Sequence, residues 1–417
     1  MAQLSGDCFA FGGPLLPIDE VERLINERVT PVSETETIPL KDARGRVLAA
    51  DVTAPIDLPP FDNSAVDGYA VRHTDLRKDE TQLAIVDRLT AGHAAARQIG
   101  AGEAIRIFTG APMPAGADTV FMQEDVRLDG SSVILPPGLK RGANRRLAGE
   151  DVRCGTIALP AGRRLLPQDL SMAAALGLRD LPVRRRVRVA IFSTGDEIVE
   201  PGTPLPAAGL YDANRALLRA LLARLDAQVS DLGILRDDRE KLSARLVEAA
   251  EGQDLVLTSG GVSTGEADYV KDAIGAAGSL VFWRVAIKPG RPVAMGVLRG
   301  TAFIGLPGNP VAVFVTFARV VRPLLLRLAG ANPEPLIALP VKAGFAYRKK
   351  KGRREYVRVS LTRRDDGYYE AHKHPQDGAG VISSLTATDG LAELADDVTE
   401  IAKGEMIGFL PYSVLAG

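Results

Sequence analysis

The chain has 417 residues, of which 46% are hydrophobic and 25% charged, and its 51 lysines and arginines balance 52 aspartates and glutamates. This near-neutral charge predicts neither nucleic-acid nor membrane binding, and the length indicates about two to four domains. The chain has two cysteines without C-x-x-C spacing, no signal-peptide pattern at its start and no apolar run long enough to span a membrane. These features predict a soluble, cytoplasmic protein.

The first third of the chain contains one helical pattern followed by β-like texture. Ile18, Val21, Leu24 and Ile25 recur at helical spacing and predict a short amphipathic helix over 18–27. From residue 63 to residue 145, short β-branched runs alternate with glycine turns. This segment therefore predicts an inserted β-rich domain.

Between residues 184 and 330, strand and helix patterns alternate, which predicts a doubly wound α/β layer. Three of its apolar strand patterns end in polar or glycine-rich loops, at 193–197, 259–268 and 307–310. In an open parallel sheet such loops lie at the carboxyl ends of strands, where ligands bind. Glycine lets backbone N–H groups approach an anion, and Glu266 and Asp268 suit a hard cation such as Mg²⁺. The alternative for any single loop is a turn that serves only the fold.

Beyond residue 332 the chain returns to short strand patterns, which predict a small all-β module. Its basic run at 347–354 is either a solvated surface or a means of steering an anionic ligand.

The segment from Pro60 to Ala70 closely resembles the signature of the molybdopterin molybdenumtransferases, the MoeA and gephyrin E-domain family. Further blocks match in the family's order at 107–114, 120–124, 145–151, 193–197, 211–215, 258–269, 286–292 and 305–310. The resemblance implies a linking domain at 1–62 and 146–183, an inserted domain at 63–145, a MogA-like α/β domain at 184–331 and a C-terminal β-barrel at 332–417. It also implies an elongated homodimer with a cleft shared between subunits.

The family's reaction takes adenylylated molybdopterin and molybdate, uses Mg²⁺, and yields molybdenum cofactor and AMP. The resemblance therefore implies these substrates, this metal ion, and transfer contacts with molybdopterin adenylyltransferase and molybdoenzymes. Two other functions remain as alternatives. An adenylyltransferase needs only the α/β unit, which leaves the insert and the β module unexplained. A scaffold would keep the fold without turnover.

The resemblance also implies roles for individual residues. Glu197 and Asp268 are expected to contact Mg²⁺, while Asp67, Asp237 and Asp268 are the candidate catalytic groups. Asp237 has an alternative role as a helix cap. The residues expected to bind substrate are Thr109, Asp151, Ser259, Gly260, Gly261, Lys288, Pro289 and Arg358.

Lys288 and Arg358 match positions that hold molybdate in the family, and fixed positive charges suit a tetrahedral dianion. For Arg358 the alternative is a surface arginine. Two positions depart from the family pattern. Ala379 stands where relatives often have serine, which removes a hydroxyl unless Ser383 or backbone groups replace it. Arg284 stands where some members have lysine. The first departure leaves the choice between molybdate and tungstate open.

Overall fold

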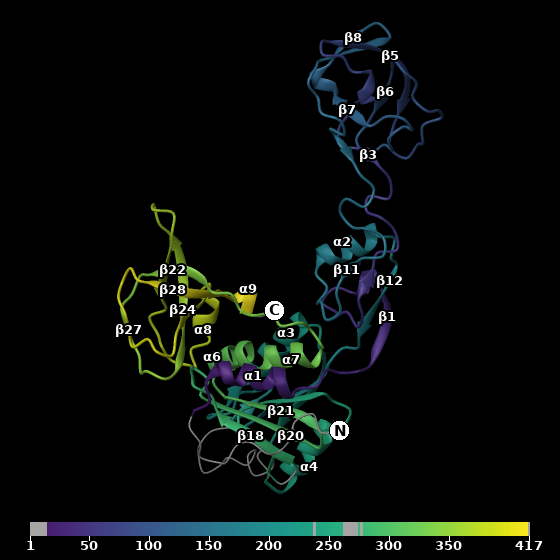
Figure 1. The fold of residues 1–417 in the computed structure, drawn as a ribbon. Helices are drawn as coiled ribbons and strands as arrows, with labels where there is room; N and C mark the ends of the chain where they lie inside the picture. Colours follow the sequence, from purple (N-terminus) through teal and green to yellow (C-terminus); the bar gives the residue numbers. More distant parts are fainter. Residues whose placement is uncertain (1–14, 237–238, 262–273, 276–277, 416–417) are drawn as a thin grey trace.

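The computed structural model describes residues 15–236, 239–261, 274–275 and 278–415, and it shows an elongated molecule. Figure 1 places the sheet containing β4–β9 at one end, joined to the rest through a region that contains β1, β11, β12 and α2. The α/β layer and the C-terminal strands form the other end. No helix in the described part of the chain is long and apolar enough to cross a membrane.

The α/β layer is built on a six-stranded sheet in the order β16-β13-β17-β21-β20-β18, in which β16, β13, β17 and β21 run parallel. The last two strands pair antiparallel. The strands are β13 (Arg188–Thr194), β16 (Gln228–Leu235), β17 (Leu255–Ser259), β18 (Gly278–Arg284), β20 (Pro292–Leu298) and β21 (Thr301–Leu306); a separate short pair comprises β14 (Ile198–Val199) and β15 (Leu210–Tyr211). Because parallel strands end at the same edge, their loops gather there as predicted.

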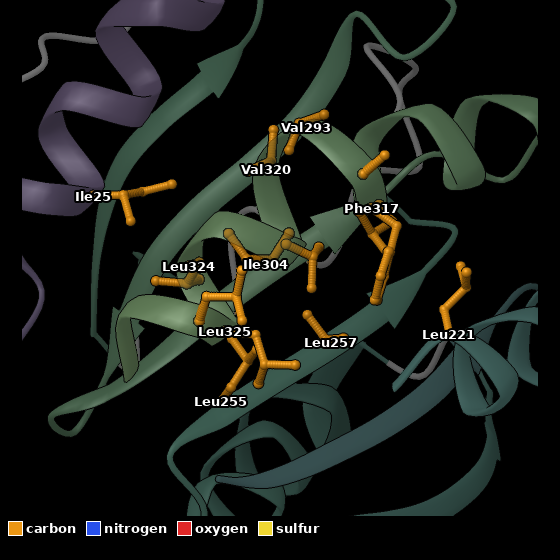
Figure 2. Close-up of a cluster of buried hydrophobic side chains, with 14 of the residues drawn as sticks. Ile25, Leu221, Leu255, Leu257, Val293, Ile304, Phe317, Val320, Leu324 and Leu325 are labelled. Atoms are coloured by element: carbon orange, nitrogen blue, oxygen red, sulfur yellow. The ribbon is translucent and has the colours of Figure 1, made fainter. Parts of the chain in front are cut away.

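Helices enclose this sheet. They are α1 (Ile18–Arg28), α3 (Ala213–Arg224), α4 (Arg239–Ala250), α6 (Pro310–Thr316) and α7 (Arg322–Leu328). Figure 2 shows Ile25 of α1, Leu221 of α3 and Leu324 of α7 in one buried cluster with strand residues such as Leu257 and Ile304. A second cluster, which contains Leu246 of α4, covers other side chains of the same strands. This packing confirms the doubly wound layer.

Two local features refine the helix predictions. The Asp212 side chain caps α3 by accepting the Arg215 backbone N–H at 3.1 Å. The apolar pattern after Pro310 is interrupted by a π-helical turn, η4 (Phe317–Val321), between α6 and α7.

The inserted segment forms a six-stranded sheet in the order β7-β4-β6-β5-β9-β8. Gly68 allows β4 to lie against β7, since an added Cβ would be 1.7 Å from the Phe121 carbonyl oxygen. The elements are β3 (Asn63–Ser64), β4 (Gly68–Val71), η2 (His73–Asp75), β5 (Thr81–Leu89), β6 (Glu103–Ile107), β7 (Thr119–Met122), η3 (Gln123–Asp125), β8 (Arg127–Asp129), β9 (Ser132–Leu135) and β10 (Arg145–Arg146).

The chain segments that enter and leave this sheet pair with each other. β3 pairs with β10, β2 with β11, and β1 with β12, all antiparallel. The elements of this linking region are β1 (Thr35–Pro39), η1 (Leu40–Asp42), β2 (Val52–Thr53), β11 (Ile157–Leu159), α2 (Pro167–Ala175) and β12 (Asp180–Arg184). The domain boundaries themselves stay a prediction.

The C-terminal strands close into a five-stranded barrel, β24-β25-β22-β28-β26, because β26 also pairs with β24. β19 (Ile287–Lys288), which precedes the barrel in the chain by about fifty residues, adds parallel to β24. The remaining elements are β22 (Leu339–Ala343), β23 (Tyr347–Arg348), β24 (Arg354–Arg363), β25 (Tyr369–Lys373), α8 (Ser383–Thr386), β26 (Gly390–Leu394), β27 (Glu400–Ile401), β28 (Met406–Pro411) and α9 (Tyr412–Leu415). The predicted β-barrel is confirmed.

Candidate functional site

Two adjoining cavities lie where the α/β layer meets the barrel. The larger cavity, of about 820 Å³, is bordered by the ends of β13 and β17 and the starts of α3 and α6. The smaller cavity, of about 320 Å³, lies between β19, β24 and the loop at 377–379. Pro292, Pro307 and Asn309 line both cavities, so the two cavities share part of their wall.

The larger cavity collects the polar strand ends that the sequence singled out. Ser259, Gly260 and Gly261 line it together with Glu197. Gly260 has φ +92°, and an added Cβ would be 2.5 Å from the Thr194 carbonyl oxygen, so only glycine fits at this close approach. The structure therefore brings these four predicted residues to one cavity.

Several buried polar atoms around this cavity lack a partner. The hydroxyls of Ser193, Thr194 and Thr258 and the Oδ1 atom of Asn214 form no hydrogen bond among the described residues. Buried polar groups are normally satisfied, so these atoms are suited to a bound polar ligand or to water.

Sequence reasoning missed the structural role of Asn214. Its Nδ2 donates to Ser259 Oγ at 2.8 Å and to the Gly308 carbonyl at 2.7 Å. These bonds tie the first turn of α3 to β17 and to the loop before α6. The only sequence signal for this role was the position of Asn214 just after the Asp212 cap. Its two hydrogen-bond partners are 45 and 94 residues away in the sequence, so the pattern could not identify them.

The smaller cavity contains a charged network around Glu355. Lys288 Nζ donates to Glu355 Oε2 at 3.1 Å and lies 3.2 Å from Tyr347 Oη, which itself donates to Glu355 Oε2 at 2.9 Å. Arg353 Nε donates to Glu355 Oε1 at 2.7 Å. One buried carboxylate thus holds two cations, and the group retains a net positive charge toward the cavity.

The pKa shifts in this network follow from the same contacts. Burial alone would raise the pKa of Glu355, but hydrogen bonds from Tyr347 and Lys288 and the nearby charge hold this pKa below its usual value. Burial would lower the pKa of Lys288, but its bonds to Tyr347 and Glu355 hold this pKa above its usual value. Lys288 therefore stays an ammonium group at neutral pH.

Arg358 is buried in the barrel wall beside this network, with 5% of its surface exposed, so the alternative of a surface arginine is wrong. Its Nε donates to Ser384 Oγ at 3.1 Å, and its Nη2 donates to the carbonyls of Gln376 and Gly378 at 2.9 and 3.2 Å. It forms no ion pair with any residue in the described ranges. Burial lowers the pKa of Arg358, because its charge is removed from water.

The loop that carries Ala379 joins the two cavities. Ala379 and Pro289 line the smaller cavity, and the Ala379 carbonyl accepts the Val311 N–H of α6 at 3.1 Å. Ser383, a proposed substitute for the missing serine, borders neither cavity; its neighbour Ser384 bonds Arg358 instead. Arg284 also lines neither cavity.

The remaining predicted residues lie elsewhere. Asp67 and Thr109 are on the inserted sheet, where Asp67 Oδ1 accepts both the N–H and the hydroxyl of Thr109 at 2.8 Å. These two bonds lower the pKa of Asp67. Asp151 is exposed in the linking region. None of these three lines either cavity, and β3 is distant from β21 in Figure 1. Asp237 and Asp268 lie outside the described residues.

The fit of a magnesium ion can be judged from Glu197. Its carboxylate is exposed in the larger cavity and makes no hydrogen bond or ion pair within the described part of the chain. Among those same residues no three His, Cys, Asp or Glu side chains gather as a metal cage. Mg²⁺ commonly binds through one or two carboxylates plus substrate phosphates, so an oxygen-lined cavity with Glu197 fits that mode of binding.

Comparisons with known proteins agree across nearly the whole chain. Residues 16–177 match a family model described as the MoeA N-terminal region (domain I and II), residues 190–327 a probable molybdopterin binding domain, and residues 340–412 the MoeA C-terminal region (domain IV). A molybdopterin molybdenumtransferase of Haemophilus influenzae is 36% identical over 408 residues, covering 97% of this chain and 100% of the relative.

A second relative, molybdopterin molybdenumtransferase 2 of Mycobacterium tuberculosis, is 36% identical over 403 residues and covers 94% of this chain and 98% of its own. The crystal structure of a molybdopterin biosynthesis MoeA protein from Pyrococcus horikoshii aligns with a TM-score of 0.80 at 30% identity. That alignment covers 96% of this chain and 100% of the other.

Proposed function

The chain belongs to the molybdopterin molybdenumtransferase family of molybdenum cofactor biosynthesis, and we propose from that premise that it inserts molybdenum from molybdate into adenylylated molybdopterin and releases AMP. Each cavity binds a different part of the substrates. The smaller one receives the oxyanion, and the larger one receives the pterin and the nucleotide phosphates.

The single observation that carries this proposal is Arg358. A buried guanidinium without a carboxylate partner is unfavourable unless an anion approaches it. Arg358 lines the smaller cavity together with Lys288, whose side chain is 45% exposed and whose ammonium group is held by Glu355. Two fixed cations at one small cavity suit a tetrahedral dianion such as molybdate.

In the larger cavity, this chain's residues bind and orient the substrate. The Gly260 N–H already donates to the Leu306 carbonyl at 3.1 Å, so the backbone N–H of Gly261 and the unpaired hydroxyls of Ser193 and Thr194 would contact phosphate or pterin oxygens. Glu197 would hold Mg²⁺, with Asp268 as the second carboxylate expected from the family. When bound, this ion supplies positive charge that favours breakage of the phosphoanhydride.

Asp67, Thr109 and Asp151 support a homodimer within this proposal. Family residues at these positions face the cleft, but in a single chain they border neither cavity. A second copy that presents its inserted sheet to these cavities would complete the site. Delivery of substrate from molybdopterin adenylyltransferase and transfer of product to molybdoenzymes belong to the same proposal.

The test is AMP release from adenylylated molybdopterin, with molybdate and Mg²⁺ each added or withheld. The proposal expects release that requires both. Tight substrate binding without molybdate-stimulated release would contradict it and favour a scaffold. Ala379 is the only residue that specifically supports either a scaffold or a tungstate-preferring enzyme. Tungstate is therefore tested as well, after molybdate and Mg²⁺.

A further inference from the structure

The inserted sheet has an open depression of its own, of about 790 Å³, separate from both cavities. It lies over β4, β5, β6 and β8, and its lining includes two arginines, one carboxylate (Asp87), one aromatic ring and apolar side chains. The lining residues used below are Tyr69, Val86, Arg88, Arg106, Gln123 and Leu128.

The two arginines lie side by side, and the Asp67 carboxylate is near enough to Arg106 for that charge to help lower the pKa of Asp67. Arg88 and Arg106 are directly paired in the parallel β5–β6 ladder. Like charges opposite each other on adjacent strands are destabilising. Neither arginine forms an ion pair among the residues described. Asp87 accepts only the Arg88 backbone N–H through its side chain, at 2.7 Å, and Arg106 donates to the neutral amide of Gln123.

Several other arginines of the same domain have carboxylate partners, although the exposed Arg77 also forms no ion pair among the described residues. Arg127 pairs with Glu80 at 2.6 Å, and Arg141 pairs with Asp118 at 2.6 Å. The inserted domain therefore pairs arginines elsewhere on its surface but leaves two positive charges side by side in its depression.

Aromatic rings hold both guanidinium groups in place. Arg88 and Arg106 lie 4.9 and 5.1 Å from the centroid of the Phe108 ring, and Arg106 also lies 4.9 Å from that of Tyr69. Stacking of this kind fixes the guanidinium plane while leaving N–H donors available. Leu128, 63% exposed, adds apolar surface at the rim.

We propose that this depression is a binding site for a phosphorylated ligand with a planar ring, in which Arg88 and Arg106 bind the phosphate. Paired guanidiniums match the geometry of phosphate oxygens, and the apolar side chains of Val86 and Leu128 in the lining suit a ring. The chemical class is that of a nucleoside monophosphate. This proposal does not depend on the molybdenum-transfer reaction.

The experiment is photolabelling of the full-length protein with 8-azido-AMP, followed by mapping of the labelled peptides. Label is expected on peptides from 81–89, 103–108 or 126–129, with inorganic phosphate competing and adenosine competing at least about tenfold more weakly than AMP. Label confined to peptides of the two cavities would overturn the site. Equal competition by adenosine and AMP would overturn the assignment of the phosphate.

Matched variants test the two arginines. Arg88→Gln removes one exposed charge, and Arg106→Lys keeps the charge but removes the planar fork; each is expected to lower labelling of these peptides about tenfold. Arg141→Gln, in the same domain but outside the peptides expected to be labelled, serves as the control and should label like wild type. If Arg88→Gln also labels like wild type, the proposal is wrong. Because Arg88 is exposed, this variant tests the site even if the Arg106→Lys variant does not fold.

Discussion

The smaller cavity and the inserted sheet differ in how their positively charged side chains are held. At the cavity, Lys288 and Arg358 each form at least two hydrogen bonds, and the Glu355 carboxylate that binds Lys288 is buried. On the inserted sheet, Arg88 and Arg106 rest on an aromatic ring and lack carboxylate partners in the described structure. The first arrangement is preorganised for one small anion, whereas the second leaves its donors open to a larger ligand.

Removing the buried cation should produce the largest loss. Arg358→Gln takes away a desolvated charge at the smaller cavity, and we expect molybdate affinity to fall about thirtyfold or more. Isothermal titration calorimetry measures this directly. Arg348→Gln is the matched control, since that arginine is 84% exposed on β23, which pairs with β27 in a separate sheet of the C-terminal region. Equal affinities for the two variants would remove Arg358 from the oxyanion site.

Glu355→Gln should reduce stability next most strongly. It removes the negative charge and one of the two acceptor oxygens that bind Lys288, Arg353 and Tyr347, and breaking a fully buried ion pair costs about 3–5 kcal/mol. Lys288 and Arg353 are partly exposed, so we expect about 2 kcal/mol in urea unfolding followed by circular dichroism. Glu400→Gln, at an exposed pair, is the control and should be near neutral.

The same variant has a pH dependence with a defined sign. The pKa of Glu355 is lowered in the folded protein, so its contribution to stability is present above the unfolded glutamate pKa of about 4.3. That contribution is lost as the pH falls through the lower, folded pKa. The difference between wild type and Glu355→Gln should therefore narrow under acidic conditions. A difference that widens there would contradict the charge network.

On the inserted sheet, Asp67→Asn should change activity more than stability. Asp67 is partly exposed, and the Oδ1 of asparagine can still accept both bonds from Thr109, so the melting temperature should hardly move. If Asp67 faces the reacting groups in a shared cleft, AMP release should fall about tenfold or more. Thr109→Ser keeps both donors and should behave as wild type. Undiminished release by Asp67→Asn would remove this residue from the catalytic candidates.

The smallest effect is expected at the loop between the cavities. Ala379→Ser adds one hydroxyl to the lining of the smaller cavity, and a single new hydrogen bond is worth about threefold in oxyanion affinity. Molybdate and tungstate binding should be measured in parallel. Ala387→Ser places the same hydroxyl at the exposed end of α8 and should change neither. An unchanged affinity at position 379 would show that the missing serine is irrelevant to the oxyanion.

The sequence predicted the elements and loops whose signals are local. The runs ending at Thr194, Ser259 and Leu306 are parallel strands, and their loops meet at one edge as expected. The link between Lys288 and Glu355 escaped prediction because these residues are 67 positions apart and meet only through the β19–β24 ladder. The π-helical turn at 317–321 was missed because an apolar pattern barely changes when one residue is added to a turn.

The pairing of β3 with β10 has a consequence for how this molecule tolerates change in length. Asn63 and Arg146 are direct partners, so the inserted sheet begins and ends at adjacent points of one ladder. Residues can therefore be added to or removed from the sheet between them without altering the distance that separates the two ends. The inserted sheet can therefore change in length while the spacing of the two paired strands that connect it to the linking region stays the same.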